Sequence, residues 1–222
     1  MIGVADLEDE SVSAFVAALG DRLSRLARCA GRSALAAAIS DHRPDYVLLG
    51  ARADASDAEA IAAAMRTASL GVMIMWGDTR PHAVIDMPGP FEVESFDRTE
   101  GLDMFTLRLR GLMRRCRPVA LAGQRSTGGT TLDEAAMTLS YGSATVPLSL
   151  EDFRLLGPLF DLPGRVWSRE DLLDLAYGAQ SANAVRTVDV KLNRTRRRLR
   201  AALGHDPIRS VRGEGYILDP GA

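Results

Sequence analysis

Residues 184–203 read AVRTVDVKLNRTRRRLRAAL, and the periodicity of this stretch predicts an amphipathic helix. At about 100° per residue, four mostly apolar side chains fall on one narrow face, as in a helix that packs on a core. Polar and basic side chains and one valine fall on the opposite face. The predicted inner face consists of Val188, Leu192, Thr195 and Leu199; the predicted outer face consists of Arg186, Val190, Asn193, Arg194 and Arg197.

The charge of this helix is strongly positive. Seven basic residues and one acid, Asp189, lie between Arg186 and Arg200. Like charges one turn apart destabilise an isolated helix. We therefore expect a polyanionic partner, and we expect Asp189 to pair with a nearby arginine inside the protein. The alternative interpretation is a charged face exposed only to solvent.

The residues after the helix predict a short β-ribbon. Gly204 is a typical helix terminator, and residues 208–218 read IRSVRGEGYIL. Apolar and polar positions alternate in this segment, and Gly213-Glu214-Gly215 is typical of a tight hairpin turn. A basic helix followed by a ribbon with Arg209 and Arg212 near its tip is the pattern of a winged helix-turn-helix.

Three stretches of the chain resemble the C-terminal effector domain of OmpR/PhoB response regulators. The spacing between them is also that of the family, including seven residues between Gly178 and Arg186. The resemblance implies a sequence-specific, DNA-binding transcription regulator that is not an enzyme, with an α+β winged helix-turn-helix domain in residues 131–222. The matching stretches are LSLEDFRLLGPLFDLPGRVWSREDLLDLAYG (148–178), RTVDVKLNRTRRRL (186–199) and IRSVRGEGY (208–216).

Two supporting helices are expected before the basic helix. Ser149 is a good N-cap, with Asp152 three residues later, and Ser168 begins the second helix. Their apolar positions are expected to be core without a further role. These positions are Phe153, Leu155, Leu156 and Leu159 in the first helix and Leu172, Leu173 and Leu175 in the second.

The resemblance places the outer face of the basic helix in the major groove of double-stranded DNA. Arg194 is the first candidate for a base contact, to the O6 and N7 atoms of guanine, because a bidentate guanidinium contact discriminates bases. Val190 is a candidate for contact with a thymine methyl group; the alternative is an incidental exposed valine. Asn193 is expected to contact a base or a phosphate.

The remaining predicted DNA contacts set the register of the protein on the duplex without reading bases. Arg212 at the wing is expected to enter a narrow minor groove, with Arg209 and Ser210 as support. For any single arginine the alternative is a solvated side chain. The predicted phosphate contacts are Arg186, Thr187, Lys191, Arg196 and Arg197.

Length and charge indicate two soluble domains. The chain has 222 residues, with 27 basic and 29 acidic side chains and a net charge of −2. Seven of the 13 basic residues after residue 117 lie on the basic helix, so local rather than overall charge indicates the partner.

No apolar run approaches the length of a membrane span, the N-terminus does not resemble a signal peptide, and we expect a cytoplasmic protein. Cys29 and Cys116 are expected to be reduced thiols without a metal or redox role.

Residues 1–117 alternate short apolar strands with helices, which predicts a doubly wound α/β domain with a parallel, flavodoxin-like sheet. Attached to an OmpR/PhoB effector domain, this order resembles a receiver domain. The expected strands are residues 2–5, 23–29, 45–49 and 71–75, and the expected helices are residues 11–19, 33–39, 58–68 and 102–116.

The receiver resemblance fails at the positions that carry phosphotransfer in that family. Asp6 keeps one acid of the magnesium-binding pair, but Gly50 stands at the acceptor aspartate position and Trp76 at the threonine or serine position. Glu94 stands where the family has a lysine. We expect a degenerate receiver without aspartyl phosphorylation, catalytic residues, bound metal or cofactor.

Dimerisation and domain linkage follow from the same resemblance. Three prolines in residues 78–91 predict a shortened or missing fourth helix, which in the family belongs to the dimer face. A homodimer is therefore expected to use residues 102–116, with Arg108, Arg110, Arg114 and Arg115 exposed, or another surface. Residues 118–130, rich in glycine, serine and threonine, are expected to be a flexible linker. The loop 179–185 corresponds to the part of the family that contacts RNA polymerase.

Two other functions stay open. In the first, the N-terminal half is a protein-interaction adaptor and the basic helix binds DNA without sequence preference. Discrete protected sites in footprinting would separate this adaptor from the regulator. The second, a phosphotransfer enzyme, requires an acceptor side chain that the sequence does not provide at residue 50.

Overall fold

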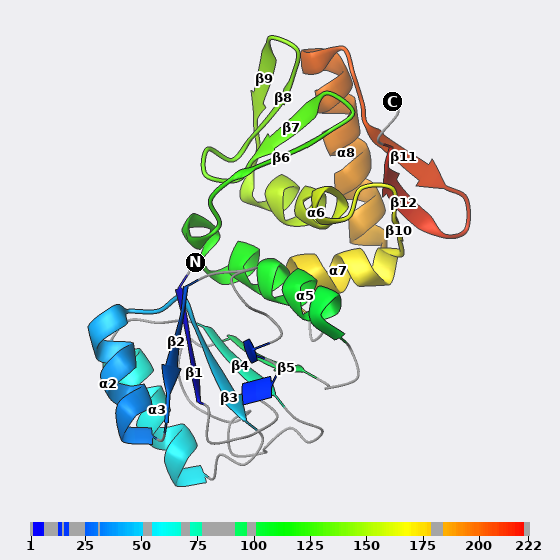
Figure 1. The fold of residues 1–222 in the computed structure, drawn as a ribbon. Helices are drawn as coiled ribbons and strands as arrows, with labels where there is room; N and C mark the ends of the chain where they lie inside the picture. Colours follow the sequence, from blue (N-terminus) through cyan, green and yellow to red (C-terminus); the bar gives the residue numbers. More distant parts are fainter. Residues whose placement is uncertain are drawn as a thin grey trace. The chain divides into compact units, whose positions relative to one another are not determined.

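The computed structural model describes residues 2–6, 13–14, 16–17, 25–30, 32–50, 55–67, 72–76, 92–96, 101–178 and 184–219. The chain divides into two compact units, Met1–Thr106 and Leu107–Ala222 (Figure 1). The domain end that we predicted at residue 117 therefore lies eleven residues beyond the end of the first unit. Of the predicted segments, most of helix 11–19, the proline-rich stretch 78–91 and loop residues 179–183 lie outside the described residues.

The first unit contains a parallel sheet, as predicted, with five strands where the sequence indicated four. Its strand order is β2-β1-β3-β4-β5, the order of flavodoxin-like folds (Figure 1). Helices α2 (Arg32–His42) and α3 (Ala55–Thr67) pack together over Val47 and Leu49 of the sheet, where Leu35, Ile39, Ile61 and Met65 are buried. The strands are β1 (Ile2–Asp6), β2 (Arg25–Cys29), β3 (Tyr46–Gly50), β4 (Val72–Trp76) and β5 (Glu92–Phe96).

The register of the parallel strands locates the four positions compared with a receiver. Asp6, Gly50 and Trp76 each end a strand, and Gly50 pairs with Trp76. Glu94 pairs with Ile74 and lies two residues before the end of β5. Phe96 takes the end of β5 instead. Its ring is buried against Phe105, with the ring centroids 4.9 Å apart in an edge-to-face arrangement.

The second unit begins with residues of helix α5 (Gly101–Cys116) and a four-stranded antiparallel sheet. The flexible linker predicted at 118–130 is a structured segment. It contains the short helix η2 (Pro118–Ala120), strand β6 and the start of β7, and Leu121 and Thr130 are buried. Gly128 and Gly129 have positive φ angles and form the β6–β7 turn. The glycines of this segment therefore indicate a hairpin turn and not a flexible linker. The strands are β6 (Gln124–Thr127), β7 (Thr130–Asp133), β8 (Thr138–Tyr141) and β9 (Ala144–Pro147).

The predicted exposure of the arginines on α5 is wrong. Arg110 is 7% exposed and Arg114 is fully buried, because both side chains pair with buried carboxylates of the same unit. Arg108 and Arg115 are half-buried. Neither Cys29 nor Cys116 forms a disulfide.

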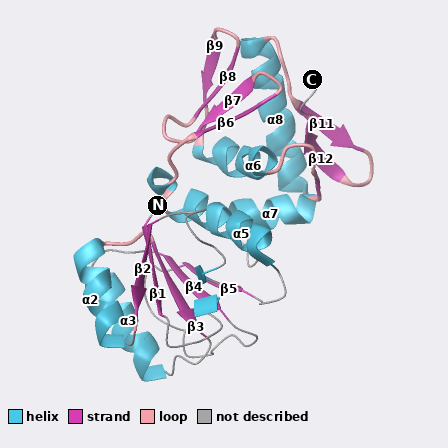
Figure 2. Cartoon of the chain, in the orientation of Figure 1, coloured by secondary structure: helices cyan, strands magenta, loops and turns pink. Residues whose placement is uncertain are grey.

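Three helices and a second small sheet complete the second unit as a winged helix-turn-helix (Figure 2). Ser149 and Asp152 form a reciprocal capping box at the start of the first helix, and Ser168 caps the second. The predicted core leucines and Phe153 are buried. The elements are α6 (Leu150–Asp161), β10 (Val166–Trp167), α7 (Arg169–Tyr177), α8 (Arg186–Leu203), β11 (Ile208–Val211) and β12 (Gly215–Leu218), with antiparallel strand order β10-β12-β11.

Candidate DNA-binding surface

Helix α8 has the two faces that the sequence predicts. Its four inner residues are buried; Thr195, the most exposed of them, is 2% accessible. Gly204 ends the helix in the left-handed conformation, with φ of 65°. All five predicted outer residues are exposed, and Val190 is 67% accessible. An exposed valine flanked by arginines is a surface on which apolar and anionic groups can bind together.

Four of the basic side chains of α8 are already paired inside the unit. Lys191 pairs with Glu151, and Arg198 pairs with Asp152 at 2.7 Å, so both partners come from the first turn of α6. Arg196 and Arg200 share Asp206, at 3.0 and 2.9 Å. These three acids offset part of the positive charge that the sequence of the helix suggests.

Three predicted contact residues keep their charge available. Within residues 101–178 and 184–219, Arg186, Arg194 and Arg212 have no ion pair or hydrogen bond from their side chains. Arg197 makes only a long bond of 3.4 Å to the carbonyl oxygen of Asn193 in its own helix. The unpaired positive charge of this surface therefore lies on the outer face of α8 and at the wing turn.

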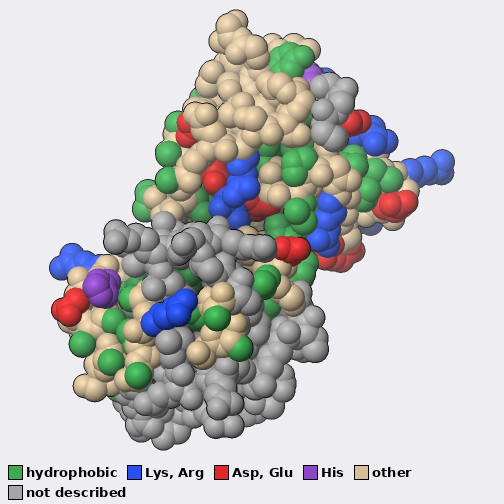
Figure 3. Space-filling view, in the orientation of Figure 1, with side chains coloured by type: hydrophobic (Ala, Val, Ile, Leu, Met, Phe, Trp, Pro, Cys, Tyr) green, Lys and Arg blue, Asp and Glu red, His purple; other side chains and the backbone are tan. Residues whose placement is uncertain are grey.

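The wing is a short hairpin formed by β11 and β12. The amide of Glu214 donates to the carbonyl of Val211 at 3.1 Å and closes the turn, leaving Arg212 exposed. Figure 3 shows basic side chains protruding at this hairpin. Arg209 pairs with Asp219 at 3.3 Å, and the hydroxyl of Ser210 accepts a hydrogen bond from Arg196. Both residues thus make internal contacts, while Arg212 faces solvent.

Asp189 pairs internally, as predicted, and joins three elements. Its Oδ1 accepts hydrogen bonds from Arg169 Nε of α7 at 2.8 Å and from the Tyr216 hydroxyl of β12 at 2.7 Å. The Arg169 guanidinium also lies over the Tyr216 ring, 5.4 Å from its centroid. Burial and the Asp189 carboxylate raise the pKa of Tyr216 to about 12. The wing is therefore attached to the first turn of α8.

Asp152 connects α6 to the buried face of α8, a role that the sequence analysis missed. It accepts hydrogen bonds from the hydroxyls of Ser149 and Thr195 and pairs with Arg198. Burial favours a higher pKa for Asp152, but the hydrogen bonds from Ser149 and Thr195 and the charge of Arg198 outweigh it and lower the pKa. The only sequence signal was a threonine among apolar residues at position 195.

The predicted phosphate contacts are not equivalent. Arg186 and Arg197 are exposed on the outer face, and Thr187 is half-buried in the first turn of α8. Lys191 and Arg196 are half-buried and ion-paired. Among the residues that the structure describes, no three histidine, cysteine or acidic side chains gather as metal ligands.

Comparison with known proteins agrees with this geometry. Residues 143–218 match the family described as "Transcriptional regulatory protein, C terminal". The phosphate regulon transcriptional regulatory protein PhoB of Rhizobium meliloti is 38% identical over 112 residues, which are 50% of this chain and 49% of PhoB. The C-terminal half of the chain is an OmpR/PhoB-family effector domain. The heme response regulator HssR of Staphylococcus epidermidis is 29% identical over 130 residues, covering 59% of this chain and 54% of HssR.

The chain spans about half the length of these curated relatives. Among solved structures, the effector domain is similar to the RstA DNA-binding domain of Klebsiella pneumoniae in complex with the RstA box. The identity is 31%, the match covers 44% of this chain and 97% of the RstA domain, and the TM-score is 0.38. No helix in the described part of the chain combines the length and the apolar character needed to cross a membrane.

Proposed function

We propose that this protein is a sequence-specific transcription regulator that inserts α8 into the major groove of promoter DNA. One observation carries the proposal. The basic residues of α8 separate into an ion-paired set on the flanks and an unpaired set, Arg186 and Arg194, beside exposed Val190. If the charges of α8 served only solubility, we would not expect ion pairs on its flanks together with unpaired arginines on its outer face.

The roles of the side chains follow from their exposure. Arg194 has its whole guanidinium available for a guanine edge, and Val190 meets a thymine methyl group. Arg186 and Arg197 bind phosphates, and Arg212 enters the minor groove. Asn193 contacts a base or a phosphate. Lys191 and Arg196 reach phosphates only at the expense of internal ion pairs, so their contribution is smaller.

We also propose that DNA binding in the cytoplasm is independent of aspartyl phosphorylation. Gly50 ends β3 at the position compared with the acceptor, and it has no side chain to phosphorylate. The protein binds as a homodimer, and the loop 179–185 contacts RNA polymerase. The names of the relatives support the regulatory role, since PhoB is called a transcriptional regulatory protein and HssR a response regulator.

The test uses the purified full chain, never exposed to a kinase. Genomic fragments are selected for binding and footprinted, and affinity is measured at several salt concentrations. We expect discrete protected sites and an affinity that falls steeply with salt, because phosphate contacts release counterions. Uniform protection of all fragments would instead support the adaptor with a nonspecific basic helix. Binding that does not respond to salt would contradict the mechanism.

A further inference from the structure

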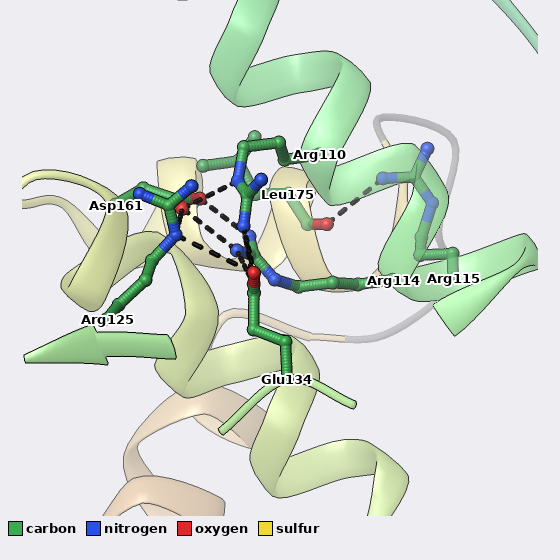
Figure 4. A network of polar contacts seen from close by, with 7 residues as sticks. All are labelled: Arg110, Arg114, Arg115, Arg125, Glu134, Asp161 and Leu175. Atoms are coloured by element: carbon green, nitrogen blue, oxygen red, sulfur yellow. Dashed lines mark hydrogen bonds and ion pairs between the residues drawn. The ribbon is translucent and has the colours of Figure 1, made fainter. Parts of the chain in front are cut away.

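The second half of α5 contributes two arginines to a buried cluster in the C-terminal unit (Figure 4). Arg110 donates to Asp161 at 2.8 Å and to Glu134 at 2.5 Å. Arg114 donates to the same two carboxylates at 3.0 and 3.1 Å. Arg125 of β6 lies 3.3 Å from Asp161 and completes a group of three cations and two acids.

The two carboxylates need these arginines. The side chains of Glu134 and Asp161 are only 2% and 3% exposed, and a buried charge is costly unless it is paired. Burial alone favours a higher pKa for Asp161, but the charges of Arg114, Arg110 and Arg125 outweigh it and lower the pKa. Without α5, both acids would face only Arg125, whose side chain is 36% exposed. The C-terminal unit thus contains two buried acids whose buried ion-pair partners come from α5.

The shape of α6 also fits Arg114. A Cβ atom at Gly157 would lie 2.1 Å from Arg114 Nε and 2.3 Å from Cζ, far inside contact distance. Glycine inside a helix is destabilising relative to alanine, so its presence needs a local cause. Gly111 of α5 likewise allows close packing, here against α7, because a Cβ at Gly111 would lie 3.0 Å from the carbonyl oxygen of Leu175.

Arginine side chains also connect the C-terminal ends of α5 and α7 to a neighbouring helix. Arg154 of α6 donates to the carbonyl oxygens of Arg114 and Arg115, at 3.3 and 2.7 Å, near the end of α5. Arg115 in turn donates to the carbonyl oxygen of Leu175, at 3.0 Å, near the end of α7 (Figure 4). A cation at a helix C-terminus satisfies unpaired carbonyls and opposes the helix dipole.

We infer that Leu107–Cys116 of α5 is a docked component of the DNA-binding unit, in which Arg110 and Arg114 are positioning residues for α6 and, through Asp152 and Thr195, for α8. The arginine face of this helix is then occupied within one chain and unavailable to a second copy. A homodimer must therefore use another surface. Only the DNA-binding role of this unit rests on the proposed function; the packing of α5 within the unit is tested without DNA.

The decisive experiment compares Gly157→Ala in two versions of the full chain, the natural one and an Arg114→Ala variant. Urea unfolding is followed by circular dichroism. In the natural chain we expect Gly157→Ala to lower the urea midpoint, because the new methyl group displaces Arg114. In the Arg114→Ala chain the same change is expected to leave the midpoint unchanged or to raise it. Equal losses in both chains would overturn the docking.

Hydrogen exchange measured by mass spectrometry covers the case in which the variants fold poorly. In the natural chain, amides of residues 107–116 are expected to exchange as slowly as those of α6. Fast exchange in 107–116 beside slow exchange in α6 would overturn the inference. In Arg114→Ala, faster exchange is expected in both α6 and α8. Rescue by Arg114→Lys is expected to be incomplete, because an ammonium lacks the planar fork of five N–H donors with which a guanidinium binds carboxylates. Unchanged exchange in α8 would overturn the positioning role.

Discussion

The hydroxyl of Tyr216 donates to the Asp189 carboxylate at 2.7 Å, and this bond joins the wing to the first turn of α8. Asp189 is the single acid between Arg186 and Arg200, and its second partner, Arg169, comes from α7. The acid therefore connects α8 to both α7 and the wing.

Tyr216→Phe should loosen the wing while keeping the core ring. Because the lost hydrogen bond involves a charged acceptor, we expect a loss of about 1–2 kcal/mol in the free energy of unfolding, measured in urea at neutral pH. The natural chain should also lose stability as pH rises from about 10 to 12. The reason is that the folded state holds the Tyr216 proton to a pKa of about 12.

The alkaline loss should be smaller in Tyr216→Phe than in the natural chain. It should not vanish, because burial also raises the pKa of Tyr177 to about 12. Identical alkaline curves for the two proteins would show that the Tyr216 hydroxyl does not bond to Asp189 in solution.

Arg194→Ala should weaken binding to the selected DNA site by about 1–3 kcal/mol and relax the base preference at one position. Arg197→Ala should weaken binding to all sequences and reduce the slope of log K against log salt by about 1. Fluorescence anisotropy at several salt concentrations measures both effects. Arg200→Ala is the matched control, since Arg200 is paired with Asp206, and a loss as large as that of Arg194→Ala would contradict our division of the helix.

Val190 is expected to read a thymine methyl group. Replacing the contacted thymine by uracil removes only that methyl, and should weaken binding of the natural chain by about 0.5–1 kcal/mol. Val190→Ala should weaken binding to the thymine site and become nearly insensitive to the uracil replacement. A double-mutant cycle over the two changes measures their coupling. A coupling of zero at every thymine of the site would leave Val190 without a role in recognition.

The N-terminal half should not accept a phosphoryl group. Incubation of the full chain with a small phosphodonor and Mg²⁺ should leave its intact mass unchanged, because Gly50 has no side-chain carboxylate to phosphorylate. A receiver that retains its acceptor aspartate serves as the positive control in the same reaction. A gain of one phosphate, mapped by peptide sequencing to β3 or its neighbours, would refute the degenerate-receiver proposal.

Thr195→Val should lower the free energy of unfolding by about 1 kcal/mol at neutral pH, because Asp152 loses one of its hydrogen-bond donors.

The pKa of Asp152 is lowered in the folded state, so its contribution to stability is present above its unfolded pKa of about 4 and is lost as pH falls below that value. The acid loss should be smaller in Thr195→Val, since the folded pKa then moves toward its ordinary value. Urea midpoints between pH 3 and 7 test this, with exposed Thr145→Val as the control; an unchanged acid profile would contradict it.

The sequence alone determined the local features of this protein. Hydrophobic periodicity predicted which residues of α8 are buried, and serine and glycine marked the ends of its helices, because helix geometry and capping depend on residues a few positions apart. Apolar runs that alternate with predicted helices indicated the parallel sheet, and this alternation is also visible in neighbouring stretches of sequence. These signals need no knowledge of distant contacts.

Only the tertiary structure decided which charges are available. Thr195 and Arg198 reach Asp152 from 43 and 46 residues away, and Arg114 reaches Asp161 from 47. In the sequence, Arg114 looks like one more surface cation, although Leu107, Arg110 and Arg114 follow helical spacing on one stripe. Whether such an arginine is solvated or buried depends on where a carboxylate lies in space, and the strength of a charge pair depends on that distance and on the surrounding solvent. Neither quantity is encoded in a local pattern.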